Sequence, residues 1–545
     1  MSARDESTTA TTTIAPKTHA EDDGRNASLL RSSATVGAVT SLSRVMGLVR
    51  DVAFANTVGA NANADAFFIA FKIPNFLRRL FADGAFSQAF IPVLAECKQE
   101  GGKAAVRELM DRAAGVLGGV LLLLTIVTMV AAPLVAALFA PGYLADEYKF
   151  ALTSDLIRIS FPYLMLISLA GLCGAVLNSY GRFAVPAFTP VLLNLCLIGA
   201  AVLVAPMLDE PVYALSAGVV VGGIAQLLFQ LPSLYRLALV PRPRWAPHHP
   251  RVKQVMTLMI PALFGVSVSQ INLLLDTVLA SFLPTGSVSW LYYSDRLTEL
   301  PLGVFAIAVA TVILPTLSAQ QASSRSEDYK VTLDWAVRSV LLVGVPAAVA
   351  LIILAKPILV TLFQYGALTN QDVAMASLSL QAYAIGLCSF MLIKVLAPGY
   401  YARKDMKTPV RIGIWAMLAN MLLNLIFVFL LTRYFQLGHV GLALATASSA
   451  ALNAVLLWRG LLKSESYQFG PQWRRFLPSM ALSCIVMMTL LLWLRPEAES
   501  LATELWWSRS ARMLVLCLFG FLTYVACLRL SGIRLADFRT PPIAS

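Results

Sequence analysis

The sequence predicts an all-α membrane protein of fourteen transmembrane helices, arranged as two six-helix lobes plus two further helices at the C-terminal end. Three observations predict this fold class. Apolar residues make up 58% of the 545 residues and charged residues only 13%, which lies outside the range of soluble domains. Basic residues alternate between the loops of the two membrane sides, and motifs of the first half of the chain recur in the second half.

The N-terminal residues 1–32 are polar and rich in Thr and Ala. They lack the apolar core of a signal peptide, so we expect a disordered cytoplasmic tail. From residue 33 onward, apolar stretches long enough to cross a bilayer are separated by short polar breaks. The predicted transmembrane segments are 33–57, 65–96, 108–139, 151–180, 186–207, 212–239, 252–282, 288–319, 333–364, 371–401, 408–432, 439–463, 474–494 and 507–530.

The loops between these segments differ in charge according to their side. Loops after even-numbered segments carry basic residues, such as Arg242 and Arg244 after the sixth segment and Arg403 and Lys404 after the tenth. The opposite loops, among them NTVGANANAD, LPTGSVSW and QYGALTNQD, contain no basic residue. This pattern predicts that the basic loops and both termini are cytoplasmic. Because basic residues collect in these cytoplasmic loops, membrane topology accounts for the net charge of +12, and we expect no nucleic-acid partner.

Two pairs of motifs recur about 220 residues apart. Pro92 in FSQAFIPVLAE matches Pro315 in AVATVILPTLSAQ, and Thr189 matches Thr408, each before a proline. Internal repeats with a binding site between them are typical of membrane transporters. The repeat predicts an N-terminal lobe at 33–240, a C-terminal lobe at 241–465, a final helix pair at 466–531 and a second cytoplasmic tail at 532–545.

Polar side chains concentrate in the first, second, seventh and eighth segments. In the second segment, Lys72, Arg79 and Asp83 fall on one helical face, and Asp65 extends that face outward. A charge at the centre of a bilayer costs about 3 kcal/mol on insertion scales, so such a stripe requires water or a partner. The first two helices of each lobe are therefore predicted to line an aqueous cavity, with polar contributions that include Ser43, Arg44, Arg50, Asp51, Arg78, Asp276, Asp295, Arg296 and Glu299.

The arginines on these faces outnumber the acids with which they could pair locally. One interpretation is structural: Arg50 pairs with Asp51 and Arg79 with Asp83 at helix interfaces, or the arginines extend toward the membrane surface. The other interpretation is that the guanidinium groups bind an anion. Because Arg fits two phosphate oxygens with a bidentate fork, the surplus favours a phosphate-bearing substrate that is carried through the membrane.

Sequence motifs for catalysis are absent. The seven cysteines form no CxxC pair, the four histidines lack zinc-site spacing, and no GxxxxGKS/T motif for ATP binding occurs. An enzyme acting on polyprenyl phosphates would need an acid–base or metal constellation, and a membrane scaffold would need no polar stripes. We therefore expect a transporter that is not an enzyme and has no cofactor, with Na⁺ as the one candidate ion.

Four motifs make the sequence resemble a known family. SRVMGLVRDVAFANTVGA, DAFFIAFKIPNFLRRLFADGAFSQAFIPVLAE, GVSVSQINLLLDTVLASFLPTGSVSWLYYSDRLTELP and KVLAPGYYARKDMKTPV look like the MurJ (MviN) lipid II flippases of the MOP exporter superfamily. The resemblance runs from about residue 33 to the end of the fourteenth segment. It implies a V-shaped cationic central cavity. It also implies transport of undecaprenyl-pyrophosphate-linked disaccharide-pentapeptide from the inner to the outer leaflet of the bacterial cytoplasmic membrane, for cell-wall synthesis.

The resemblance also implies roles for individual residues. In this family, arginines on helices one, two and eight engage the pyrophosphate, and helices thirteen and fourteen form a groove for the lipid tail. An acid at the outer end of helix two is a further family feature, and Asp65 matches it. The matching substrate-binding residues are Arg44, Arg50, Arg78, Arg296 and Asp65, and the residues expected to support the polar cavity are Ser43, Lys72, Arg79, Asp83, Asp295 and Glu299.

Some members of the family resemble a sodium-linked form, with an acid on helix seven and polar residues on helix eleven. Here Asp276 lies on the seventh segment, and Asn420 and Asn424 lie on the eleventh, where that form has a second carboxylate. One interpretation is a Na⁺ site built from these oxygen ligands. The other is that the two asparagines satisfy each other, or a backbone carbonyl, between helices. Both interpretations stay open at the level of sequence.

The alternatives to a lipid II flippase are other MOP-type exporters, either of lipid-linked oligosaccharides or of drugs. A multidrug antiporter would need a smaller cavity, an acidic cation site and fewer arginines, so the arginine surplus argues against it. The expected partners are lipid II and membrane lipids, with cell-wall synthesis and division proteins as candidate protein partners. The chain is expected to act as a monomer.

Overall fold

A computed structural model of the chain describes residues 19–534 and 538, with the side chains of all of these except 19–34, 81–83 and 264–269. The described residues form helices joined by short turns, without strands. Each of the fourteen predicted segments is helical. Eleven helical segments of the described chain are long and apolar enough to cross a bilayer. The chain is therefore a multi-pass membrane protein of the predicted all-α class.

The first helix begins earlier than the sequence predicts. Residues 1–18 of the expected disordered tail lie outside the described residues, but α1 (His19–Thr57) is helical through residues 19–32, so the prediction is wrong for this part. The stretch Ala27–Arg31 contains Ala, Leu and Arg, which are strong helix formers, so the membrane helix continues through it. The predicted second tail at 532–545 lies mostly outside the described residues.

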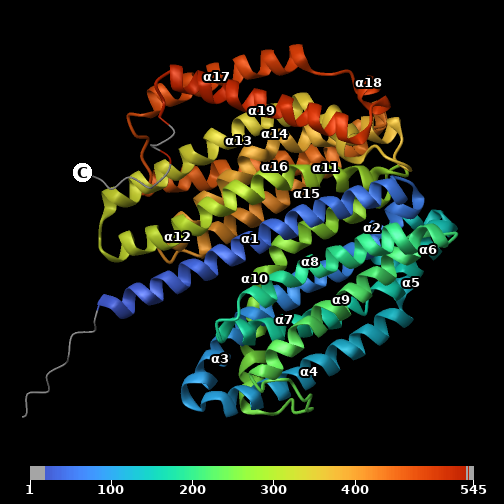
Figure 1. Ribbon diagram of the computed structural model, residues 1–545, viewed down its shortest axis with the longest axis vertical. Coiled ribbons are helices and arrows are strands. Elements are labelled where there is room, and N and C mark those ends of the chain that lie inside the picture. Colours follow the sequence, from blue (N-terminus) through green and yellow to red (C-terminus); the bar gives the residue numbers. More distant parts are fainter. Residues whose placement is uncertain (1–18, 535–537, 539–545) are drawn as a thin grey trace, which may run out of the picture.

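The N-terminal lobe packs α1 along α8, α9 against both α7 and α8, and α2 against α6 (Figure 1). Its second segment is interrupted, because Pro74 donates no hydrogen bond and π-helical turns begin four residues later at Arg78. The lobe consists of α1, α2 (Ala62–Leu77), η1 (Arg78–Phe86), α3 (Ser87–Glu100), α4 (Gly102–Val130), α5 (Ala132–Phe139), η2 (Pro141–Ala145), α6 (Glu147–Ser160), α7 (Tyr163–Ser179), α8 (Ala184–Gly199), η3 (Ala200–Val204), η4 (Ala205–Met207) and α9 (Pro211–Arg236).

The C-terminal lobe is built around α14, which packs against α13 and α16. Its second segment is interrupted as in the first lobe, since α11 ends at Pro301 and the π-helical η5 follows before α12. The lobe consists of α10 (Pro250–Ser281), α11 (Ser287–Pro301), η5 (Leu302–Ala306), α12 (Ile307–Ala322), α13 (Ser326–Phe363), α14 (Asn370–Tyr401), α15 (Lys407–Phe435) and α16 (Gly438–Lys463).

Helix α10 lies between the two lobes. It packs against η1 and α3 of the N-terminal lobe and against α15 of the C-terminal lobe. Near its start, Arg251 Nη1 lies 3.1 Å from Glu96 Oε2 on α3. Further along, the carboxylate of Asp276 accepts a hydrogen bond from Asn424 of α15. This helix therefore connects one lobe to the other along the length of the bundle.

The last helices, α17 (Trp473–Leu494), α18 (Ala498–Thr503) and α19 (Trp506–Leu530), pack on α13 at the edge of the C-terminal lobe (Figure 1). The buried carboxylate of Asp334 on α13 anchors the connection that leads into them. It accepts hydrogen bonds from Tyr467 Oη at 2.9 Å, from Trp473 Nε1 and from Arg338 Nε at 2.8 Å. This anchor holds the terminal helices on the lobe through buried polar contacts.

Candidate functional site

A cavity of about 1020 Å³ lies between the lobes. One wall consists of α1, α2, η1, α3, α7, α8 and α9, and the other consists of α10, α11, η5, α12, α14 and α16. Six basic and four acidic side chains line the cavity, a formal surplus of two positive charges. The basic residues are Arg44, Arg50, Lys72, Arg78, Arg79 and Arg296, and the acidic residues are Asp51, Asp276, Asp295 and Glu299.

The charges are divided unevenly between the two walls. The N-terminal lobe contributes five of the basic side chains and one acid, while the C-terminal lobe contributes three acids and one base. We call the first group, Arg44, Arg50, Lys72, Arg78 and Arg79, the basic wall. We call the second group, Asp276, Asp295 and Glu299, the acidic wall. An anion that enters the cavity is therefore attracted to the N-terminal lobe.

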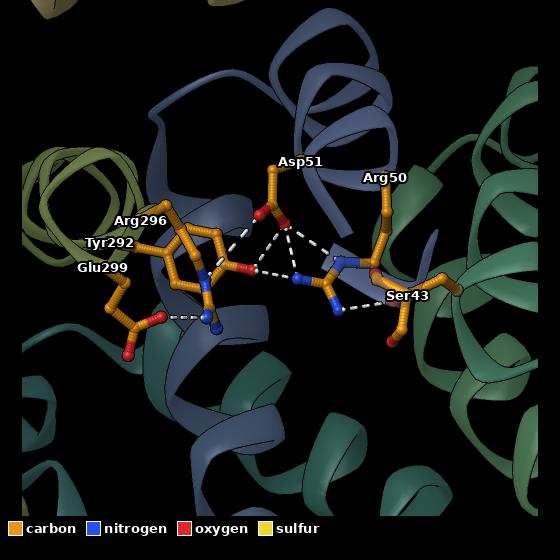
Figure 2. A network of polar contacts seen from close by, with 7 residues as sticks. Ser43, Arg50, Asp51, Tyr292, Arg296 and Glu299 are labelled. Carbon is orange, nitrogen blue, oxygen red and sulfur yellow. Dashed lines mark hydrogen bonds and ion pairs between the residues drawn. The ribbon is translucent and has the colours of Figure 1, made fainter. Parts of the chain in front are cut away.

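The carboxylate of Asp51 organises the centre of the cavity (Figure 2). Its Oδ1 accepts hydrogen bonds from Arg50 Nη2 and from Tyr292 Oη, both at 2.7 Å. Its Oδ2 lies 3.7 Å from Arg296 Nε on α11. Arg50 also donates to Asn194 Oδ1 on α8 at 3.0 Å. One acid thus fixes two arginines that come from opposite lobes.

The sequence left open whether Arg50 pairs with the neighbouring Asp51, and the structure contains this ion pair. Arg296 has a second acidic partner, since its Nη1 donates to Glu299 Oε2 at 2.8 Å, and its guanidinium lies over the Tyr292 ring. The arginine surplus is therefore smaller at this point than the sequence predicts. Arg50 and Arg296 are held in place by acids that an anionic ligand would have to displace.

The remaining residues of the predicted cavity come from several elements. Arg44 reaches from α1 to η5, where a Cβ at Gly303 would lie 1.5 Å from Arg44 Nη1. Lys72 Nζ lies 3.4 Å from Thr277 Oγ1 on α10. The backbone carbonyl of Ser43 accepts a hydrogen bond from Asn194 Nδ2 at 3.1 Å. Arg78, Arg79 and Asp295 also line the cavity, and the side chain of Asp83 lies outside the described residues.

Asp65 lies outside the cavity lining, contrary to its predicted place among the substrate-binding residues. Its carboxylate is buried and accepts hydrogen bonds from Gly286 N at 2.7 Å, from Ser289 N at 2.9 Å and from Ser289 Oγ at 2.6 Å. These backbone donors belong to the start of α11, where a carboxylate satisfies the free N–H groups of a helix end. The polar stripe of α2 therefore ends in a contact between the lobes and not in the cavity.

Two glycines allow the lobes to meet closely beside Asp65. Gly59, at φ +63°, lies so near the other lobe that a Cβ would be 2.5 Å from Ala367 O. Gly366, at φ +57°, would bring a Cβ to 2.4 Å from Asn56 O. Ala367 N also donates to Asn56 O at 3.0 Å. We call these contacts the seal, because together with Asp65 they close the lobes at one end of the cavity.

Two residues that contact the arginines, Tyr292 and Asn194, were not predicted from the sequence. Tyr292 is one of two neighbouring tyrosines and carries no charge that would mark it. Asn194 lies in an apolar segment, where a single amide is a weak signal. The side chain of Asn194 lines the cavity beside Arg50. The one sequence signal for this residue is that an isolated amide in a membrane helix needs a hydrogen-bond partner.

The candidate sodium ligands lie together. Asn424 Nδ2 donates to Asp276 Oδ1 at 2.7 Å and to Asn420 Oδ1 at 2.9 Å. Both asparagines are buried, and Asn424 Oδ1 has no hydrogen-bond partner among the described residues. No group of three or more His, Cys, Asp or Glu side chains in the described chain is arranged to hold a metal ion. Asn424 thus links Asn420 to Asp276, and both interpretations of these residues stay predictions.

Two helical lobes around one central cavity form a membrane-transporter fold that solved transporters share. A solved multidrug transporter of the MOP superfamily, a MATE protein in an inward-facing conformation, shares this fold with a TM-score of 0.64 at 15% identity, over 79% of this chain and 98% of its own. A solved lipid II flippase MurJ in an inward closed conformation agrees better, with a TM-score of 0.75 at 27% identity, over 91% of this chain and 98% of its own.

A family model described as "Lipid II flippase MurJ" matches residues 54–507. The probable lipid II flippase MurJ of Vibrio cholerae serotype O1 is 50% identical over 521 residues, which cover 94% of this chain and 98% of that protein. The lipid II flippase MurJ of Burkholderia cenocepacia is 44% identical over 469 residues, which cover 85% and 90%. The chain belongs to the MurJ family of lipid II flippases.

Proposed function

We propose that this chain moves lipid II, the undecaprenyl-pyrophosphate-linked disaccharide-pentapeptide, from the inner to the outer leaflet of the bacterial cytoplasmic membrane for cell-wall synthesis. The basic wall is the observation that carries the proposal. Its guanidinium groups fit phosphate oxygens as bidentate forks. The formal surplus of two positive charges in the lining matches a pyrophosphate diester with about two negative charges.

The direction of transport follows from the orientation of the chain. We assign the basic loops to the cytoplasm, which also places the predicted termini there. The seal then lies on the outer side, and the cavity is accessible from the inner leaflet, where the substrate is loaded. Reporter fusions at residues 245 and 404 should report a cytoplasmic location. Fusions at 60, 209, 285 and 368 should report the opposite side, and one reversed site would contradict this orientation.

We further propose that the chain acts as a monomer and catalyses no covalent reaction. Transport then needs only that the seal opens while the two lobes close around the other end of the cavity, so that access alternates. Cell-wall synthesis and division proteins remain the candidate protein partners. The arrangement of Asp276, Asn420 and Asn424 makes Na⁺ the candidate coupling ion, and membrane potential is the alternative driving force.

The test of this function uses Arg50→Ala and Arg296→Ala in cells that lack their own flippase. We expect normal abundance in the membrane, no complementation, and accumulation of lipid II in the inner leaflet. Arg→Lys at the same positions should also fail, because an ammonium group cannot bridge two phosphate oxygens. Arg325→Ala, at an exposed arginine beside α13, is the matched control and should complement. Full complementation by both cavity variants would refute the proposed function.

A further inference from the structure

Two glutamines of α9, Gln226 and Gln230, line a part of the cavity that extends into the N-terminal lobe between α7, α8 and α9. They are one helical turn apart and are 2% and 1% exposed. Gln226 Nε2 donates to Thr189 O on α8, and Gln230 Nε2 donates to Ala170 O on α7, each at 3.0 Å. The Oε1 atom of each side chain has no hydrogen-bond partner among the described residues.

The orientation of both amides is determined by their partners. Because Thr189 O and Ala170 O can only accept a hydrogen bond, the NH₂ group of each glutamine must face them. Each Oε1 therefore points away from the helix contact as an acceptor. Most buried polar atoms of native proteins are paired, so two unpaired carbonyl oxygens side by side require an explanation. Each of them can accept a hydrogen bond from water or from a ligand group that enters the cavity.

The wall beside these oxygens is open over Gly171 of α7, where a Cβ would meet nothing within 4 Å. At Gly174 a Cβ would lie 3.5 Å from Gln230 Oε1 and 3.3 Å from the ring of Pro186, so the wall is closed there by Pro186. Gly171, Gly174 and Pro186 all line the cavity. A ligand group that approaches over Gly171 can reach the glutamine oxygens when the Pro186 side of the wall shifts.

The distance of the two glutamines from the arginine cluster follows from the contacts of α8. Gln226 is bonded to the backbone of Thr189, and Asn194, which binds Arg50, follows five residues later on α8. Five residues of helix span about 7.5 Å, so Gln226 lies roughly one sugar unit away from the arginine cluster, and Gln230 lies one helical turn further along α9. A phosphate has only acceptor oxygens at this position and is disfavoured. A neutral group attached directly to the pyrophosphate, with hydroxyl or acylamino donors, is favoured.

We propose that Gln226 and Gln230 form a subsite for the sugar that is joined to the pyrophosphate of the substrate. The subsite rests on the proposed function, since it assumes that the pyrophosphate lies at the arginines. The sugar hydroxyl and acylamino N–H groups donate to the two Oε1 atoms. The arginines then recognise the charge of the headgroup, and the glutamines distinguish a glycosylated lipid pyrophosphate from the bare one.

The test measures binding of three probes to the purified full chain in lipid nanodiscs. The probes are undecaprenyl pyrophosphate, the same lipid carrying the disaccharide without peptide, and the complete disaccharide-pentapeptide lipid. The variants are Gln226→Met, Gln230→Met and the double variant, which keep the side-chain volume but remove both the acceptor oxygen and the N–H group that donates to the neighbouring helix. Gln381→Met is the matched control, because Gln381 also donates to a neighbouring backbone carbonyl but lies outside the cavity lining.

We expect each single variant to bind the two sugar-bearing probes about three- to tenfold more weakly, as for the loss of one neutral hydrogen bond. Their affinity for undecaprenyl pyrophosphate should be unchanged, which also shows that they are folded. No loss, or an equal loss for all three probes, would overturn the subsite. A loss confined to the peptide-bearing probe would overturn the assignment to the sugar. If the unmodified chain binds none of the probes, the proposed function itself fails.

Discussion

Asp51 is the residue on which the charge arrangement of the cavity depends most. It is 1% exposed and lies between two arginines from opposite lobes. In a region shielded from water, such ion pairs are stronger than at a surface. The carboxylate therefore orients the guanidinium groups and also occupies the positions that phosphate oxygens would take. Removing the charge of Asp51 should show whether orientation of the arginines or competition with phosphate oxygens has the larger effect on binding.

Asp51→Asn keeps the shape of the side chain and removes its charge. We expect the affinity for undecaprenyl pyrophosphate to rise by about tenfold, because a charge-assisted hydrogen bond of about 1.5–3 kcal/mol no longer competes with the ligand. Transport should become slower, since release also becomes slower. Binding and flipping assays in vesicles measure both quantities. Glu299→Gln, which removes the ion pair with Arg296 and leaves the contacts of Arg50 in place, should change the affinity less. A weaker affinity for Asp51→Asn would show that orientation outweighs competition.

At the residue scale, the sequence predicts the charged side chains of the cavity lining except for the misplaced Asp65, but it does not predict which residues they contact. Arg44, Arg50 and Arg296 could be found because charge in a membrane helix requires a polar surrounding. The contact of Asp51 with Tyr292 joins residues 241 positions apart, and that of Arg50 with Asn194 joins residues 144 positions apart. Such contacts depend on how whole helices pack against one another, and a local sequence pattern does not predict this packing.

At the element scale, the seal depends on backbones that approach without side chains between them. Gly59 and Gly366 have positive φ values and face backbone atoms of the other lobe. An L-residue there has both an unfavourable conformation and a steric overlap with atoms that cannot move aside. Asp65 adds the hydrogen bonds that hold the start of α11. The seal is therefore sensitive to single added methyl groups.

Gly59→Ala and Asp65→Ala should both weaken the seal. We expect a cysteine placed at Asn75 in the cavity to react several-fold faster with a membrane-impermeant thiol reagent added from outside, in a background whose native cysteines are replaced. Gly413→Ala is the control, since its Cβ would meet nothing within 4 Å and its backbone is ordinary helix. Unchanged labelling in both variants would show that the seal does not control access.

The anchor of the terminal helices makes a separate prediction. Asp334→Ala leaves the buried Arg338 guanidinium without its carboxylate, which costs about 3–5 kcal/mol for a broken buried pair. The thermal unfolding temperature of the purified protein should fall. Asp334→Ala with Arg338→Met removes both charges and should recover most of the loss. A double variant no more stable than Asp334→Ala would assign the loss to Tyr467 and Trp473 instead.

The elements themselves were predictable to different degrees. Helices were found because long apolar stretches in a bilayer must satisfy their backbone internally. The interruptions at η1 and η5 follow prolines, but Pro92 and Pro346 lie within continuous helices, so a proline alone does not predict a wide turn. Asp65 was placed among the substrate-binding residues because it matches the acid that the family resemblance implies at the outer end of the second helix. Its contact with the start of α11 depends on how the lobes pack, which the sequence does not show.

At the scale of the whole molecule, the driving force can be tested. Moving about two negative charges outward gains roughly 2.3 kcal/mol per charge per 100 mV of inside-negative potential. We expect Asp276→Ala and Asn424→Ala to keep substantial activity, and activity to be independent of external Na⁺. Flipping in vesicles with an imposed potential, with and without Na⁺, measures this. Loss of activity in both variants together with a sodium requirement would make the ion part of the mechanism.

The unequal walls have a consequence for the empty transporter. Opposite charges attract, so the acidic and basic walls on the two sides of the cavity draw the lobes together when nothing lies between them. A dianionic headgroup bound to the basic wall neutralises that attraction and faces the acidic wall with its own negative charge. The bound substrate thus weakens the attraction between the two lobes. Binding of the substrate therefore favours separation of the two lobes. When the substrate has left, the attraction between the acidic and basic walls returns and draws the lobes together again.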